Sequence, residues 1–277
     1  MVFGPFRQLQ KAFDRVAQGD LESDITVDTY RETSLLSQAV KKSLTKLKAV
    51  DQSRQEFVSN VSHELKTPLA LMRGYTEGLE QGIGDREEYL ARMEEQIDRM
   101  DRLVLELLEQ TRLERMEQLP RMEQVDLTGL IRTLLEQTAP LFDGLTVRTR
   151  LQEGCSLSGD RALLERAYGN LLSNAARYCT PGGQVQIQLE RAPYAPVFTI
   201  WNHAGPIPET ELPRLFEPFY RGDTARDRSG SGMGLALCEK IAALHGGRLQ
   251  IESVEGEGTA VTVRLPAADG KEGGAAV

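Results

Sequence analysis

Residues 57–69 of this chain read FVSNVSHELKTPL, and their apolar positions recur every three or four residues. The same spacing continues to Leu79, which is the pattern of an amphipathic helix. The apolar stripe consists of Phe57, Val61, Leu65, Pro68, Met72, Tyr75 and Leu79. Because Pro68 removes a backbone donor, it is predicted to bend this helix.

His63 lies off the apolar stripe. At about 100° per residue, it is about 200° from Val61, so its side chain is predicted to face water. Glu64 follows it, and Thr67 lies one turn later on roughly the same face. An exposed imidazole is a nucleophile near neutral pH, but an ordinary solvated helix face looks the same. Helix geometry alone leaves these two interpretations about even.

A turn at Gly82, Gly84 and Asp85 separates this helix from the next. The next helix has the cleanest repeat in the chain, with alternating steps of three and four residues. Its stripe consists of Leu90, Met93, Ile97, Met100, Val104, Leu107 and Thr111. A hairpin of two such helices exposes one apolar face, and two copies close a four-helix bundle, so the sequence predicts a homodimer.

Two shorter helices are predicted before the hairpin, separated by a break at Gly19-Asp20. The first has a coiled-coil seam at Phe6, Leu9, Phe13 and Val16. The second carries Leu36, Val40, Leu44 and Leu47. Short amphipathic helices do not bury their stripes alone, so both are expected to need a partner chain.

The pattern changes near Pro120. From Val125 onward, short alternating strands such as 185–189 and 261–265 mix with helices, which predicts an α/β sandwich after the α-helical N-terminal part. Residues 269–277 are rich in Gly and Ala and are predicted to form a disordered tail.

The second half also carries candidate ligand-binding residues. Asp160 is a good N-cap for a helix that runs to about Tyr178, with Asn170, Asn174 and Arg177 beside its apolar stripe. Two amides and a guanidinium can coordinate a cation and hold phosphate oxygens, although a solvated edge explains them as well. Further on, the glycine-rich run 229–235 opens a helix whose N-terminus would attract phosphate, and such a run alone is weak evidence.

Composition narrows the possible classes of protein. The 277 residues are 40% hydrophobic and 27% charged, and the net charge of −8 disfavours a nucleic-acid binder. No apolar run approaches the length that a transmembrane helix needs. The three cysteines, Cys155, Cys179 and Cys238, lack metal-type spacing and are expected to be reduced thiols.

Five segments together resemble the sensor histidine kinases of two-component systems. Residues 57–69 are similar to the family's H-box, and residues 170–178, NLLSNAARY, are similar to its N-box. Residues 215–221, LFEPFYR, resemble its F-box, and 230–235 and 256–259 resemble its second and third glycine boxes. The order of these segments matches the family, which implies a dimeric helical bundle followed by a Bergerat-type ATP-binding sandwich. The resemblance implies a HAMP-like signal relay at 1–50, a dimerisation and phosphotransfer domain at 51–117, and a catalytic ATP-binding domain at 121–268.

The resemblance also implies residue roles. His63 would accept the γ-phosphoryl group of ATP and pass it to an aspartate of a response regulator, with Glu64 polarising the imidazole. Thr67 would position water when the protein dephosphorylates that regulator. Asn174 would bind Mg²⁺, with Asn170 beside it, and a lid at about 209–230 would bring Arg226 and Arg228 to the phosphates. The implied nucleotide contacts are Asn170, Asn174, Arg177, Tyr178, Asn202, Gly205, Ile207, Phe216, Arg221, Gly230, Gly232, Gly234, Leu235 and Thr259.

The sequence departs from the family in its first glycine box. Asn202, Ala204 and Pro206 stand where the family usually has an aspartate and two glycines. That aspartate accepts a hydrogen bond from the adenine amino group, and the Asn202 carbonyl can still accept it as a neutral partner. Weaker or differently tuned ATP binding is therefore expected. Asn170 stands where related ATPases such as gyrase, Hsp90 and MutL carry a glutamate base, which favours phosphoryl transfer over hydrolysis because an amide cannot act as a base.

The N-terminal 50 residues resemble a HAMP relay only in part, because Arg31-Glu32-Thr33-Ser34 lacks the Asp and Gly common there. HAMP units normally follow a transmembrane helix, so the chain is expected to be the soluble, cytoplasmic portion of a sensor anchored in the bacterial cell membrane through a missing upstream segment. Two alternatives remain open. One is a pseudokinase scaffold that no longer holds ATP, and the other is an ATP-hydrolysing machine of the gyrase and Hsp90 type.

Overall fold

The computed structural model describes residues 31–192, 195–222 and 230–266. The predicted helix at 6–16, its break at Gly19-Asp20, Arg226, Arg228 and the tail at 269–277 lie outside these residues. The chain divides into two compact units, 1–66 and 67–277, which are described separately. None of the helices in the described ranges combines the length and hydropathy that a bilayer crossing requires.

One long helix, α2 (Arg31–Glu80), replaces two of the predicted helices. The sequence predicts one helix around Leu36 to Leu47 and a separate one from Phe57, and this division is wrong. Residues 48–56 contain neither Gly nor Pro, so nothing in the sequence ends the helix there. The helix also continues through Pro68, which is buried.

The predicted turn joins α2 to α3 (Arg86–Glu114). Gly82 and Gly84 adopt the left-handed conformation, with φ of 65° and 82°. Asp85 caps α3, because its side chain accepts a hydrogen bond from the Glu87 N–H at 2.8 Å. The Tyr89 ring lies against Gly78 and Gly84, so both glycines allow the chain to fold closely around it.

The rest of the second unit is an α/β sandwich, as predicted. Its five-stranded sheet has the order β2-β4-β5-β7-β6, with β2 parallel to β4 and the other neighbours antiparallel. The strands are β2 (Thr146–Leu151), β4 (Gln184–Arg191), β5 (Pro196–Asn202), β6 (Arg248–Val254) and β7 (Gly258–Arg264). A separate pair joins β1 (Glu123–Asp126) to β3 (Ser156–Gly159).

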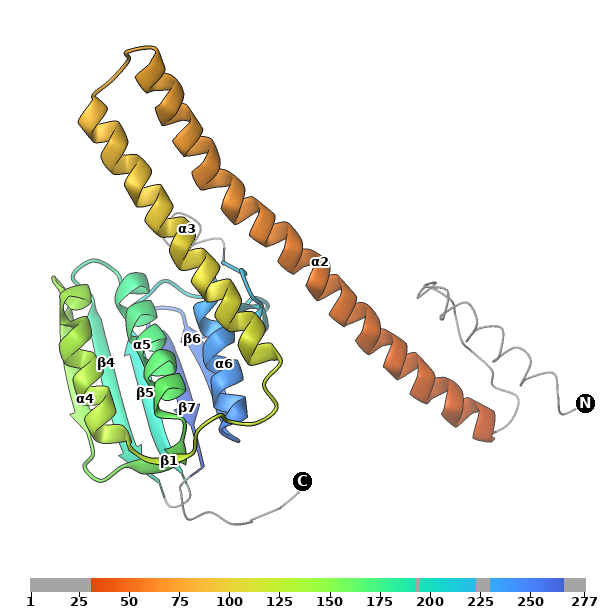
Figure 1. Ribbon diagram of the computed structural model, residues 1–277. Helices are drawn as coiled ribbons and strands as arrows, with labels where there is room; N and C mark the ends of the chain where they lie inside the picture. The colour runs from red at the N-terminus through yellow and green to blue at the C-terminus, as the bar shows by residue number, and fades with distance from the viewer. Residues whose placement is uncertain (1–30, 193–194, 223–229, 267–277) are drawn as a thin grey trace, which may run out of the picture. The chain divides into compact units, whose positions relative to one another are not determined.

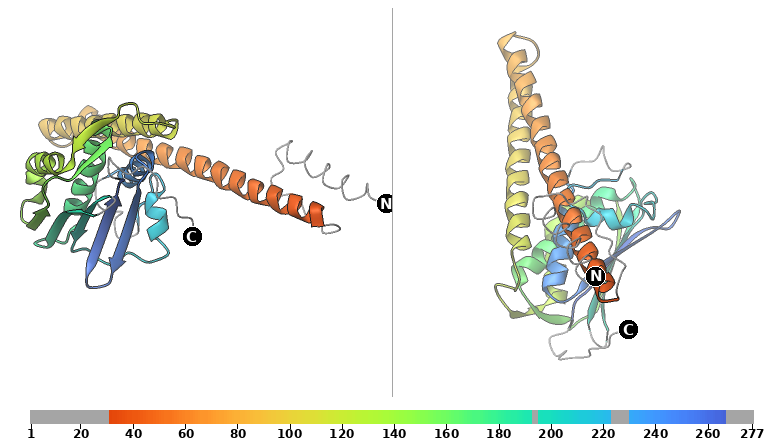
Figure 2. Two further views of the ribbon diagram at one scale, coloured as in Figure 1. Left: turned by 90° about the horizontal axis from the view of Figure 1, so that it is seen from below. Right: turned by 90° about the vertical axis from the view of Figure 1, so that its right-hand side faces the viewer.

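Three helices cover one face of the five-stranded sheet (Figures 1 and 2). They are α4 (Leu127–Thr138), α5 (Arg161–Tyr178) and α6 (Gly234–Leu244). Two short 3₁₀ turns, η1 (Ala139–Phe142) and η2 (Leu212–Phe216), complete the unit. Along β4, buried Val185, Ile187 and Leu189 alternate with half-buried glutamines, so one face meets the helices and the other meets water.

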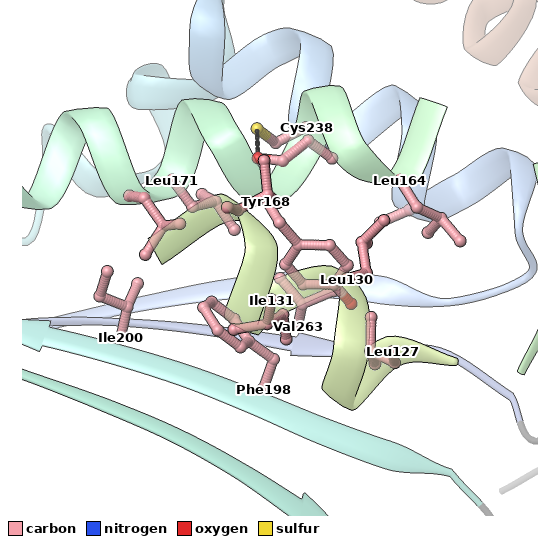
Figure 3. Close-up of a cluster of buried hydrophobic side chains, with 14 of the residues drawn as sticks. Leu127, Leu130, Ile131, Leu164, Tyr168, Leu171, Phe198, Ile200, Cys238 and Val263 are labelled. Atoms are coloured by element: carbon pink, nitrogen blue, oxygen red, sulfur yellow. Dashed lines mark hydrogen bonds between the residues drawn. The ribbon is translucent and has the colours of Figure 1, made fainter. Parts of the chain in front are cut away.

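The core lies between these helices and the sheet (Figure 3). Tyr168 of α5 meets Phe198 of β5 edge to face, with ring centroids 4.9 Å apart. Cys238 of α6 donates its S–H to the Ala167 carbonyl at 3.3 Å, and burial raises the pKa of its thiol to about 12. This cysteine is therefore a packing residue, in keeping with the predicted free thiols.

The end of α3 belongs to the same core. Leu113 is fully buried there, and Met116 and Leu119 pack against the cluster. Nearby, the Glu109 carboxylate of α3 lies 3.3 Å from the Arg166 guanidinium of α5. The hydrophobic core of the sandwich therefore begins before the predicted domain boundary at 117.

His245 ties the end of α6 to the start of α5. Its Nε2 accepts the Asp160 N–H at 3.0 Å, so in the neutral ring Nδ1 carries the proton and donates it to the Ile241 carbonyl at 2.7 Å. Gly159 lies so close that a Cβ there would be 2.5 Å from the ring. Burial lowers the pKa of His245, outweighing the bond to Ile241 and the charge of Asp160, which raise it.

This pKa shift predicts a stability that depends on pH. Below about pH 6.5 the unfolded chain binds a proton that the folded chain does not, so the contribution of His245 is complete above that pH and falls as the pH drops towards the lowered pKa. Between pH 7.5 and 5.5, the free energy of unfolding of the wild type should fall more than that of His245→Gln. Urea denaturation followed by the fluorescence of Trp201, the single tryptophan, measures this difference. Equal slopes for the wild type and His245→Gln would contradict the prediction.

Candidate functional site

The asparagine-bearing helix is α5, which begins and ends as the sequence predicts. The Asp160 side chain caps it by accepting the Leu163 N–H at 3.2 Å. Its apolar side is buried against the sheet. Asn170 and Asn174 are half-buried, and Arg177 is exposed. The helix therefore keeps both amides and the guanidinium out of the core, on one edge.

The glycine-rich run lies against this edge of α5. A Cβ added at Gly234 would be 3.8 Å from both the Asn170 side chain and Asn174 Nδ2. At Gly230, whose φ is 149°, a Cβ would be 2.5 Å from Arg177 Nη1. Any side chain at these two glycines would occupy the space beside the amides and the guanidinium. The structure thus brings together two segments that are about 60 residues apart in the sequence.

Gly234 is also the first residue of α6. The N-cap, Met233, makes no side-chain capping bond to the helix, so no cap competes for the N–H groups of the first turn. Ser231 Oγ instead accepts the Met233 N–H at 3.3 Å. A helix N-terminus beside two amides is suited to bind an anion and its counterion.

The end of β5 meets the start of β7. Asn202 is paired with Thr259 across the two strands, and a Cβ at Gly258 would be 2.5 Å from the Asn202 carbonyl oxygen. Ser253 Oγ lies 3.0 Å from Thr259 Oγ1 and accepts the Ile207 N–H at 3.1 Å. Ser253 thereby links the first and third glycine boxes. Sequence reasoning missed this residue, because no local pattern indicates it.

The side chain of Asn202 is buried, and its neighbours His203 and Gly205 in the first glycine box lie at the surface. The residue is 6% exposed, and its Nδ2 is buried without a hydrogen-bond partner. Next to it, His203 is exposed, and its Nδ1 lies 3.1 Å from Thr180 Oγ1. Gly205 also lies at the surface, and a Cβ there would meet nothing within 4 Å, so the structure does not bring it against another site residue.

The F-box segment is held against the glycine-rich run. Phe216 ends η2 and packs against the core. Phe219 has a positive φ of 67°, and its N–H donates to the Gly232 carbonyl at 3.1 Å. Arg221 is half-buried. The peptide geometry at Phe219 was not foreseen, because nothing in the sequence signals a left-handed phenylalanine.

The remaining predicted residues lie on α5, α6 and α2. Tyr178 ends α5 half-buried, and Leu235 packs against the core from α6. On α2, His63 is exposed, which confirms the predicted orientation away from the apolar stripe. Glu64 beside it is half-buried, and Thr67 is exposed.

Two protein-family models match the chain. The model described as "His Kinase A (phospho-acceptor) domain" matches residues 53–115, which contain His63. The model described as "Histidine kinase-, DNA gyrase B-, and HSP90-like ATPase" matches residues 159–269, which contain all of the segments gathered around α5 and β5. The order of these two matches agrees with the predicted order of the helical part and the sandwich.

Two curated relatives and one solved structure are also similar to this chain. The heme sensor protein HssS of Staphylococcus haemolyticus is 30% identical over 268 residues, which are 96% of this chain and 58% of that protein. The sensor-like histidine kinase SenX3 of Mycobacterium tuberculosis is 35% identical over 226 residues, covering 79% of this chain and 55% of that protein. The chain thus spans just over half the length of these relatives. Histidine kinase ThkA, solved in complex with the response regulator TrrA, has a similar fold, with a TM-score of 0.63 at 20% identity, covering 80% of this chain and 66% of that chain.

The packing of the glycine-rich run predicts an asymmetry between two glycines. Gly232 and Gly144 have nearly the same φ, 75° and 78°, but only at Gly232 would a Cβ meet backbone, 2.8 Å from Phe219 C. Gly144→Ala should cost about 1–2 kcal/mol of stability, for the left-handed conformation alone. Gly232→Ala should cost about 3 kcal/mol or more, because the Phe219 backbone must also move. Urea denaturation measures both, and equal losses would mean that the run is not packed against Phe219.

Proposed function

This chain belongs to the sensor histidine kinase family, and from that premise we propose that it phosphorylates its own His63 with ATP and passes the phosphoryl group to an aspartate of a response regulator. We propose that it also dephosphorylates that regulator. The observation that carries the proposal is the approach of the glycine-rich run to Asn170, Asn174 and Arg177 on one edge of α5. The exposed His63 on α2 supplies the acceptor.

The proposed nucleotide site uses amides, backbone N–H groups and arginines. Asn174 would bind Mg²⁺ with Asn170 beside it, and their amide oxygens fit a hard cation that takes its remaining ligands from phosphates and water. When bound, Mg²⁺ would neutralise charge on the phosphates. Arg177 and the N–H groups at the start of α6 would hold phosphate oxygens. The proposed contacts are Asn170, Asn174, Arg177, Tyr178, Asn202, Gly205, Ile207, Phe216, Arg221, Gly230, Gly232, Gly234, Leu235 and Thr259.

The proposed reaction is an in-line displacement. A ring nitrogen of His63 forms a bond to the γ-phosphorus, and the bond from that phosphorus to the β–γ bridging oxygen breaks. The bridging oxygen keeps the electron pair and leaves as part of ADP. The proton on the other ring nitrogen is stabilised by Glu64 and then passes to solvent. Most of the catalytic effect comes from positioning and charge neutralisation.

Asn170 favours phosphoryl transfer over hydrolysis of ATP. Asn170 has an amide where a hydrolase of this fold would need a carboxylate base, and an amide cannot take the proton of water. Thr67, one turn beyond His63, would instead help to position water when the protein dephosphorylates the regulator. The partner is proposed by analogy with ThkA, which was solved with the regulator TrrA.

We also propose that the active form is a homodimer. Leu90, Ile97 and Val104 recur every seven residues on α3 and are 46%, 48% and 44% exposed. Such a row is the seam of a helical bundle with its partner removed. The proposed domains are a HAMP-like relay at 1–50, a dimerisation and phosphotransfer domain at 51–117, a catalytic domain at 121–268 and a tail at 269–277. Anchoring in the bacterial membrane through an upstream segment is part of the same proposal.

The kinase proposal is tested with γ-labelled ATP and Mg²⁺. The wild type should acquire phosphate that is labile to acid and stable to base, because it is a phosphohistidine. His63→Gln should abolish the label by removing the acceptor, and Asn174→Ala should abolish it by weakening the binding of Mg-ATP. His203→Gln removes another exposed histidine and should retain the label.

Other outcomes of the same assay identify the alternatives. Label that persists in His63→Gln means that the acceptor is wrong. Steady phosphate release without labelled protein would favour the hydrolytic machine, and a wild type that binds no nucleotide would favour the scaffold.

The dimer proposal is tested by placing a charge on the heptad row. Val104→Lys should convert dimers to monomers, because two lysines would face each other in a desolvated seam. Glu95→Lys introduces the same side chain at an exposed position about 180° around α3 and should leave the dimer intact. Sedimentation equilibrium measures both, and a Val104→Lys protein that remains dimeric would exclude this row as the interface.

A further inference from the structure

We infer that Asn202 makes the nucleotide site tolerant of both purines, so that it accepts guanosine triphosphate as well as adenosine triphosphate. The inference rests on the proposed function, since it assigns a substrate range to the same site. It concerns one amide at the last residue of β5, where the base of the nucleotide would lie.

The first observation is an unused donor. Asn202 is 6% exposed, and its Nδ2 has no hydrogen-bond partner. A buried donor that stays unpaired costs roughly 1–3 kcal/mol, and folded proteins rarely leave one without a reason. A ligand that offers an acceptor next to a donor would satisfy the whole amide.

The second observation is that the surrounding polar groups bond to one another and not to this amide. Thr259, the cross-strand neighbour of Asn202, lies with its Oγ1 3.0 Å from Ser253 Oγ. Ser253 also accepts the Ile207 N–H. Among the described residues, no neighbour fixes which side of the amide is oxygen and which is nitrogen.

An amide of this kind can read either purine. The six-position edge of adenine offers a donor, the N6 amino group, beside the N1 acceptor. Guanine offers the reverse, the O6 acceptor beside the N1–H donor. Asn202 carries one acceptor and one donor side by side, so a turn of 180° about its last bond matches it to the other base.

A carboxylate at this position behaves differently. It has acceptors only, so it takes the amino group of adenine, but in the same base orientation it faces the O6 oxygen of guanine, and two acceptors repel each other. The neutral amide removes that repulsion. Asn202 is thus a specificity-determining residue that allows either purine base to bind. Compared with a carboxylate, the amide lacks a charge to attract the adenine amino group, and its second hydrogen bond, from Nδ2 to the base, offsets that loss.

The test compares binding of ATP and GTP, each with Mg²⁺, to the purified full chain by titration calorimetry. For the wild type, the two dissociation constants should agree within about fivefold, since either base makes two hydrogen bonds. For Asn202→Asp, GTP should bind at least about tenfold more weakly than ATP. Gln188→Glu makes the same change from amide to carboxylate on the water-facing side of β4 and should keep the wild-type ratio.

Distinct outcomes separate this inference from the proposed function. A wild type that binds ATP but rejects GTP as strongly as Asn202→Asp does would overturn the inference and leave the kinase proposal standing. A wild type that binds neither nucleotide would overturn both. Should Asn202→Asp fail to fold, Asn202→Ala takes its place: it should weaken ATP and GTP by similar factors, and a loss confined to ATP would contradict the shared use of the amide.

Discussion

The site depends on the burial of one side of α5 against the sheet. Tyr168, Leu171 and Ala175 are held in the core, so the helix cannot rotate about its axis without exposing them. Because the helical period is 3.6 residues, that restraint also fixes Asn170 and Asn174 on the adjoining edge of the helix. The cap at Asp160 and the bridge from His245 set where the helix begins. The core thus preorganises polar groups that contribute little to it.

Much of this architecture follows from local pattern. The two long helices, the turn at Gly82 and Gly84, the cap at Asp160 and the exposed position of His63 are consequences of periodicity and turn chemistry over short stretches of chain. The same reasoning divided α2 into two helices, although residues 48–56 contain neither Gly nor Pro. Without Gly or Pro between them, the two stripes share one helix.

The assembly of the site was beyond local pattern. The meeting of Asn202 with Thr259 depends on β7 lying beside β5, and strand order is not encoded in any one segment. Only the resemblance to a family indicated it. The link through Ser253 and the bridge through His245 carried no signal at all, because a lone serine or histidine becomes meaningful only through a neighbour that is distant in sequence.

The burial of Leu113 has a consequence for how such proteins diversify. This side chain belongs to α3 of the helical hairpin, yet it lies in the core of the α/β sandwich. The two parts are therefore not freely exchangeable cassettes. A hairpin taken from a relative must carry a side chain of similar volume at this position, because otherwise the core of the sandwich is left with a cavity that costs about 2–5 kcal/mol of stability. Exchange of the helical hairpin between relatives is therefore constrained by this one buried leucine.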